Sequence, residues 1–287
     1  MLKQRLITAV VLIPLALAAI FLLPLAWFGV VVTAVLVLAA WEWSALMGVS
    51  KKLTRLAYTL LNTVILAALY WLTPFEDIWQ QDGIVDGLFY VVFTAGLWWL
   101  LAIVLVFNFP RSKVLWCKSC AFVGVFGVLV LVPAWAALMA LRSLHYDSNP
   151  LFGAFTVLFV FVLIWAADVG AYLTGKQFGK HKLMPAVSPG KTLEGLIGGV
   201  LLAIAAMIIV AQLISLPNEL ALSFYGLGIV TVLVSVFGDL NESMFKRCAG
   251  VKDSGSILPG HGGILDRIDS LTSALPIFLL GYLWLIH

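Results

Sequence analysis

Nine long stretches without a charged residue restrict what this chain can fold into. A hydrocarbon layer about 30 Å thick requires about 17–25 apolar residues per helix, and these stretches lack the alternation of membrane β-strands. Because a helix satisfies its own backbone hydrogen bonds inside lipid, we expect an all-α, polytopic membrane protein with about nine transmembrane helices. The nine stretches are 6–23, 25–41, 56–72, 88–107, 121–141, 151–167, 195–216, 220–238 and 271–286.

The composition excludes the other broad classes of protein. Of the 287 residues, 63% are hydrophobic and 11% are charged, whereas soluble domains carry about 25% charged residues. Disordered chains are likewise far more polar. The sequence Cys117-x-x-Cys120 has no second Cys or His pair, so we do not expect it to bind a metal. The first apolar stretch continues past a signal-peptide-like start, which favours an uncleaved anchor.

The positions of the basic residues predict the orientation in the membrane. With nine spans, all of the 17 Lys and Arg residues except Arg142 fall on one side. Since basic loops stay in the cytoplasm, we expect a cytoplasmic N-terminus and an external C-terminus. The first two stretches meet at Pro24, which predicts a tight helical hairpin or one bent element. We expect residues 1–150 to form a scaffold, cavity wall or dimer contact and residues 151–287 to form the catalytic region.

Two polar segments precede the last spans. Asp168 lies near the cytoplasmic end of the sixth predicted span, where it either pairs with Lys176 or Lys180 or faces a cavity that holds a metal or substrate. Ser188 and Pro189 predict a helix start, and a helix N-terminus attracts anions. Lys191 and Thr192 are therefore expected to contact phosphate, the alternative being a capped helix with a lysine that reaches out of the membrane.

The richest polar segment spans residues 238–269. Asp239, Glu242 and Ser243 share one face of a helix, as do Asp266 and Asp269. Four carboxylates at the membrane edge would repel one another unless cations lie among them, and oxygen ligands beside phosphate favour Mg²⁺. Carboxylates for a metal and cations for phosphate are what phosphoryl and nucleotidyl transfer require. The interleaved basic residues are Lys246, Arg247, Lys252 and Arg267.

This segment resembles the signature of the phosphatidate cytidylyltransferases (CDP-diacylglycerol synthases). The matching pattern is Ser243-x-x-Lys246-Arg247-x₄-Lys252-Asp253-x₅-Pro259-x-His261-Gly262-Gly263-x-x-Asp266-Arg267-x-Asp269. The segments around Asp168 and from Ser188 to Glu194 extend the resemblance, whereas the earlier spans are only generically similar. The resemblance implies a dimeric, Mg²⁺-dependent helical enzyme of a bacterial inner (plasma) membrane. It would convert CTP and phosphatidate to CDP-diacylglycerol and pyrophosphate, with no nucleic acid partner.

We assign roles to these residues as hypotheses. Asp239 and Asp266 are the first choice as metal ligands, with Asp269, Glu242 and Asp168 as secondary ligands, and a second cation is left open. Lys246, Arg247, Lys252 and Arg267 would hold phosphates, and His261 would shape the loop or donate to pyrophosphate. The remaining substrate-binding candidates are Ser188, Lys191, Thr192, Glu194, Ser243, Asp253, Gly262 and Gly263.

Two other functions stay open at this point. A cation-coupled transporter would also bury Asp168, but transporter sites lie near the bilayer midplane within repeated halves, and no repeat is visible. Another intramembrane phospholipid or polyprenyl transferase is the nearer rival. The Asp-Gly-rich motif of CDP-alcohol transferases and the paired Asp-x-x-x-Asp runs of prenyltransferases are both absent from the sequence.

Overall fold

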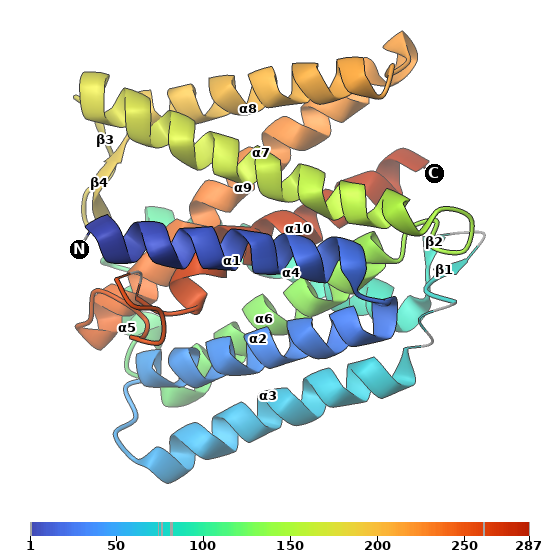
Figure 1. Cartoon of the computed structure of the whole chain (residues 1–287). Coiled ribbons are helices and arrows are strands. Elements are labelled where there is room, and N and C mark those ends of the chain that lie inside the picture. Colours follow the sequence, from blue (N-terminus) through green and yellow to red (C-terminus); the bar gives the residue numbers. More distant parts are fainter. Residues whose placement is uncertain (1, 74, 76, 81–82, 261, 287) are drawn as a thin grey trace.

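The computed structural model describes every residue except 1, 74, 76, 81–82, 261 and 287, and nine long helices dominate it (Figure 1). Each of the nine predicted spans corresponds to one of them, which confirms the helical membrane architecture. The long helices are α1 (Leu2–Leu22), α2 (Leu25–Leu46), α3 (Lys52–Leu72), α4 (Asp86–Phe107), α6 (Cys120–Arg142), α7 (Pro150–Phe178), α8 (Leu193–Leu213), α9 (Asn218–Ala249) and α10 (Leu265–Ile286).

The outer surface of the bundle is apolar, as a bilayer requires. Within the part of the chain that the structure describes, eight helices are long and apolar enough to span a membrane, and Val10–Leu22 of α1 forms a shorter apolar helix. Large apolar side chains such as Leu100, Leu201 and Leu222 are exposed on these helices. A surface this rich in exposed apolar groups suits lipid rather than water, so the protein is an integral membrane protein.

The joint between the first two spans is a helical hairpin rather than one bent helix. Helix α1 ends at Leu22, Pro24 is the N-cap of α2, and the two helices run in opposite directions (Figure 1).

Two helices continue well past the uncharged stretches that predicted them. The stretches end at residues 167 and 238, whereas α7 continues to Phe178 and α9 to Ala249. Each extension adds about three helical turns. Three of the charged residues in these turns, Asp168 and Lys176 of α7 and Asp239 of α9, line one cavity. The C-cap of α9 is Gly250, whose φ of 71° suits glycine, and the N–H of Val251 donates to the Lys246 carbonyl at 3.0 Å.

The chain also contains short elements that the all-α expectation lacks. They are the helix α5 (Lys113–Trp116) and two antiparallel hairpins, β1 (Trp79–Gln80) with β2 (Gly83–Ile84) and β3 (Lys182–Met184) with β4 (Ser188–Thr192).

The predicted helix start at Ser188 and Pro189 is therefore wrong. Pairing with β3 holds this segment extended, with Met184 opposite Ser188. Helix α8 begins only at Leu193, and its N-cap is Thr192, whose Oγ1 accepts the Gly195 N–H at 3.1 Å.

Packing gathers the functional segments at one end of the bundle. The β3–β4 hairpin and the loop between α9 and α10 lie at the end where α1 starts, and the C-terminus lies at the other end (Figure 1). Helix α10 packs against α9, α6 and α4, so its apolar side chains belong to the same core as the earlier spans. Helices α7 and α8 approach closely because Gly170 faces Gly198, where a Cβ on Gly170 would lie 2.5 Å from the Gly198 carbonyl oxygen.

A buried arginine connects helices α1, α6 and α7 at the opposite end of the bundle. Arg142 is 2% exposed, and its guanidinium donates to the carbonyls of Ile20 at 2.8 Å and Pro150 at 3.1 Å. It thereby satisfies a carbonyl in the last turn of α1 and links it to the start of α7, far from the polar site.

Candidate functional site

A cavity of about 480 Å³ opens between α7, α8, β4 and α9. This volume lies within the range of small-molecule sites. Its charged lining residues come from three elements: Asp168 and Lys176 from α7, Lys191 from β4 and Asp239 from α9. The cavity therefore combines cations with carboxylates, as the sequence predicts for a site that handles phosphate.

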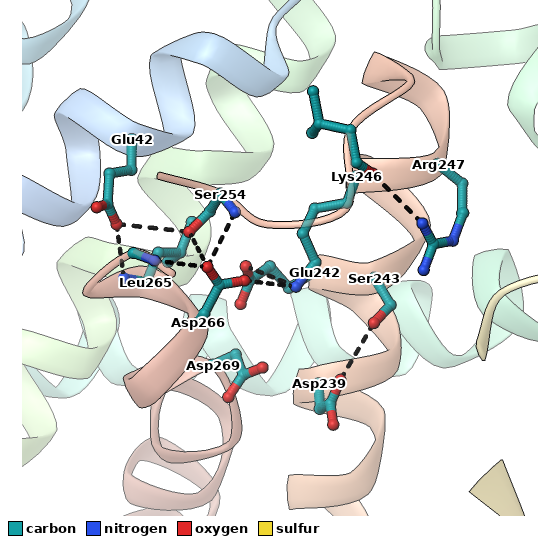
Figure 2. A network of polar contacts seen from close by, with 12 residues as sticks. Glu42, Asp239, Glu242, Ser243, Lys246, Arg247, Ser254, Leu265, Asp266 and Asp269 are labelled. Carbon is teal, nitrogen blue, oxygen red and sulfur yellow. Dashed lines mark hydrogen bonds and ion pairs between the residues drawn. The ribbon is translucent and has the colours of Figure 1, made fainter. Parts of the chain in front are cut away.

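Lys191 and Asp239 form the ion pair at the centre of this lining. Nζ of Lys191 lies 2.9 Å from Oδ2 of Asp239 and donates to the Val236 carbonyl at 3.3 Å. The other oxygen of Asp239 accepts the Ser243 hydroxyl at 3.1 Å (Figure 2). The β3–β4 hairpin thus presents a lysine to the helix that carries the acidic residues.

Asp168 faces the cavity and makes no hydrogen bond or ion pair with any residue that the structure describes. Of the two readings of this residue, the geometry supports the cavity-facing one over a pair with Lys176 or Lys180. Lys176 lies instead with Nζ 5.7 Å from the centre of the Tyr172 ring. The Asp168 side chain is exposed to the cavity, and the positive charge of Lys191 acts on it without a direct ion pair. Its carboxylate oxygens are therefore open to a bound cation.

A second charged cluster joins α9 to α10. Lys246 is 7% exposed, and its Nζ lies 3.2 Å from Oε1 of Glu242 and 2.7 Å from Oδ1 of Asp266 (Figure 2). A lysine therefore lies among the acids, where the sequence requires a cation. Because this ammonium group is buried between two carboxylates, Lys246 positions them rather than offering a free charge to phosphate.

Asp266 has its second oxygen fully occupied. Oδ2 accepts the backbone N–H of Ser254 at 2.9 Å, the Ser254 hydroxyl at 2.9 Å and the Gly263 N–H at 2.8 Å. The bond to the residue three positions earlier is the return half of a capping box. Asp266 therefore closes the loop between α9 and α10 onto the first turn of α10.

Asp269 is less constrained. It lies one turn further along α10 than Asp266 (Figure 2). Its Oδ1 accepts the N–H of Ser270 at 2.8 Å. The negative charge of Asp239 acts on it across the helix interface. A cation between these two carboxylates would relieve their repulsion.

Several predicted substrate contacts have structural partners instead. Glu194 accepts the N–H groups of Lys180 at 3.1 Å and His181 at 3.2 Å, and lies 2.6 Å from Nδ1 of His181. Thr192 caps α8, as described above. Arg247 donates to the Val187 carbonyl at 3.1 Å, which links α9 to the β3–β4 turn.

The remaining predicted residues lie on the loop or at its ends. Lys252, Asp253 and Arg267 are exposed, and Ser188 is half-buried in β4. Gly262 has a φ of 81°, and Gly263 is buried against Asp266. His261 lies outside the described residues.

One acid that contacts the site, Glu42 of α2, is absent from the residues predicted from the sequence. Its carboxylate accepts the N–H of Ile264 at 3.1 Å and of Leu265 at 2.8 Å. The available signal was a single acid between Trp41 and Trp43, immediately after an uncharged stretch. Tyr172 and Lys176 also line the cavity, and neither was predicted to bind substrate.

The carboxylates of the site fit Mg²⁺ only if phosphate oxygens of the substrate supply further ligands. Among the described residues, no three His, Cys, Asp or Glu side chains are placed to hold a metal together. Glu242, however, is 2% exposed, and neither of its oxygens accepts a hydrogen bond of sound geometry from a described residue. Mg²⁺ commonly takes one or two carboxylates together with phosphate and water, and Asp168, Asp239, Glu242 and Asp269 can supply that number.

Fold and site together define a polytopic membrane protein with a cavity lined by lysines and carboxylates at one end of its helical bundle. The chain belongs to the cytidylyltransferase family, whose family model matches residues 3–285. It is 41% identical to a protein of Haemophilus influenzae named phosphatidate cytidylyltransferase, over 100% of both chains. A Pseudomonas aeruginosa protein of the same name is 44% identical over 97% of this chain and 96% of its own.

Proposed function

We propose that this chain is a phosphatidate cytidylyltransferase, which makes CDP-diacylglycerol and pyrophosphate from CTP and phosphatidate. The full-length similarity to two proteins of that name supports the activity. The observation that carries the proposal into the structure is the cavity in which Lys191 pairs with Asp239 beside Asp168.

The reaction needs charge neutralisation and alignment more than proton transfer. The second pKa of a phosphate monoester is about 6, so the lipid phosphate is already a nucleophile near neutral pH. One of its oxygens forms a bond to the α-phosphorus of CTP. The bond from that phosphorus to the oxygen bridging the β-phosphate breaks, and pyrophosphate leaves with the electron pair. Holding two polyanions in line is then the main task of the protein.

The residues of the cavity divide that task. Lys191 and Lys176 hold phosphate oxygens of CTP at the mouth of the cavity, and Lys191 exchanges part of its pairing with Asp239 for substrate. Outside the cavity lining, the ion pairs of Lys246 keep Glu242 and Asp266 in fixed positions.

The cofactor in this proposal is Mg²⁺. It would be held by Asp239 together with Asp168, Glu242 or Asp269. Asp168 lines the cavity, and neither oxygen of Glu242 accepts a hydrogen bond of sound geometry from a described residue. When bound, it supplies positive charge against the phosphate oxygens of CTP. Asp266, whose oxygens accept bonds from Lys246, Ser254 and Gly263, moves from first choice to a supporting position.

We place the active site at the cytoplasmic face and the C-terminus outside. Helix α1 starts at the same end of the bundle as the site (Figure 1). All of the 17 Lys and Arg residues except Arg142 fall on that side of the predicted spans. This placement brings cytosolic CTP to the lipid surface that holds phosphatidate. The homodimer implied by the resemblance is part of the same proposal, and cross-linking in the membrane tests it.

The direct test is an assay of the purified full-length protein in detergent. With labelled CTP, phosphatidate and Mg²⁺, we expect label to enter a lipid product and pyrophosphate to appear in equal amount. Omitting phosphatidate or Mg²⁺ should abolish both products. A folded protein that forms no labelled lipid under these conditions would contradict the proposal.

A further inference from the structure

Glu42 is a buried acid in the second span, far in sequence from the other charged residues of the site. Its side chain is 2% exposed in a helix that is otherwise largely apolar. A carboxylate buried without partners would be strongly destabilising, so its position requires an explanation.

The partners of Glu42 are the open backbone donors at the start of α10. Oε1 accepts the Ile264 N–H at 3.1 Å and Oε2 accepts the Leu265 N–H at 2.8 Å (Figure 2). The first N–H groups of a helix have no partner within the helix, and a negative charge there is favoured by the helix dipole. A neighbouring residue normally fills this place, whereas here the cap comes from a residue 223 positions away.

The loop between α9 and α10 is shaped around this carboxylate. A Cβ atom added to Gly255 would collide with Oε1 of Glu42, and one added to Gly263 would collide with Oε2. Two glycines of the loop therefore leave space for Glu42. The contact is a close fit on both sides rather than a chance approach.

The contact continues directly to the acids of the site. The Ser254 hydroxyl lies 3.5 Å from Oε2 of Glu42 and 2.9 Å from Oδ2 of Asp266, and Asp266 binds Lys246 of α9 through its other oxygen. Glu42 thereby fixes the start of α10, from which both Asp266 and Asp269 project. A displacement of this start would move both acids relative to α9.

We propose that Glu42 is a positioning residue for catalysis, which holds the first turn of α10 so that Asp266 and Asp269 face α9. This inference rests on the proposed transferase function. Glu42 contacts the loop and not the cavity lining, so it acts through these residues and does not touch substrate.

The test compares Glu42→Gln and Glu42→Asp with Arg142→Gln. The control removes the charge of another buried side chain that caps helix-end backbone groups, but at the far end of the bundle. For folded Glu42→Gln we expect kcat to fall about 10- to 100-fold, as a misplaced catalytic group does. The KM for CTP should stay within about twofold, because Lys191 and Asp168 lie on other elements. Glu42→Asp, which keeps the charge, should recover part of the loss.

Hydrogen–deuterium exchange supplies a readout that does not depend on turnover. In Glu42→Gln, amides of residues 254–265 should exchange faster while those of α7 and α8 stay as in the wild type. In Arg142→Gln, thermal stability should fall, whereas kcat per folded protein should not.

Three results would overturn the proposal. The first is a folded Glu42→Gln enzyme with wild-type kcat. The second is a loss of activity that matches only the loss of folded protein, as in the control. The third is failure of both Glu42 variants to fold while Arg142→Gln folds, which would make Glu42 a stability residue. An inactive wild-type enzyme would count against the transferase function itself and not against this role.

Discussion

Nζ of Lys191 lies 2.9 Å from Oδ2 of Asp239, and this pair joins the β3–β4 hairpin to α9 at the wall of the cavity. The side chains of both residues are partly exposed, so substrate can reach them. An incoming phosphate can therefore take over part of the lysine's pairing.

Replacing Lys191 should impair CTP binding. We expect Lys191→Met to raise the KM for CTP about tenfold or more, since a charge-assisted contact to phosphate is lost. Lys180→Met is the matched control, because Lys180 lies nearby without lining the cavity. Steady-state kinetics with CTP as the varied substrate measure both. Equal KM values for the two variants would argue against phosphate binding by Lys191.

Asp168 should affect the response to metal. If it contributes to holding Mg²⁺, then Asp168→Asn should raise the Mg²⁺ concentration for half-maximal activity about tenfold or more. Glu219→Gln, an acid at the other end of the bundle, should leave the Mg²⁺ titration unchanged. An unshifted Mg²⁺ curve in Asp168→Asn would remove this residue from the ligand set.

The pair between Lys246 and Asp266 should matter for both stability and turnover. Removing one member of a buried ion pair costs about 3–5 kcal/mol, so Lys246→Met and Asp266→Asn should each lower the thermal unfolding temperature as well as kcat. Because the two residues are in direct contact, the double variant should lose much less stability than the sum of the single variants. Additive losses in a double-mutant cycle would show that the contact does not couple them.

Glu194 should behave as a residue that stabilises the β3–β4 hairpin. Its carboxylate binds two backbone N–H groups and His181 rather than facing the cavity. We expect Glu194→Gln to leave the KM for CTP within about twofold of wild type. Limited proteolysis should cut faster within residues 180–192. A large rise in KM would restore the substrate-binding role that the sequence suggested.

The orientation can be tested with single cysteines introduced into a cysteine-free variant. Lys180→Cys should react with an impermeant maleimide only after the membrane is permeabilised. Glu219→Cys should react in intact cells. The reverse pattern would contradict a cytoplasmic active site.

The sequence predicted the spans well because apolar length alone determines them. It also placed Asp239 and Ser243 correctly on one helix face, since the Ser243 hydroxyl reaches Asp239 within about one turn. It failed at Ser188, because the extended conformation there depends on pairing with β3. The uncharged stretches mark only part of α7 and α9, because a charged residue interrupts the apolar pattern even where the helix continues.

The long-range contacts were beyond sequence reasoning. Nothing near Glu42 indicates that its partners lie in residues 254–265, because that contact exists only after α2 and α10 pack. Such long-range contacts decide which carboxylates remain available to a metal or a substrate. Asp239 and Asp266 look equivalent in sequence, yet the structure commits Asp266 to the loop and leaves Asp239 at the cavity.

The cap that α2 provides to α10 has a consequence for how members of this family can be recombined. Consider a chimera that takes residues 151–287 from one relative and residues 1–150 from another. Its loop between α9 and α10 then comes from one protein, and the residue at position 42 that contacts this loop comes from the other. Swaps that keep a glutamate at position 42 should assemble an active enzyme. Swaps that place an apolar residue there should yield a folded bundle with a misaligned reaction centre, even when every signature residue is retained.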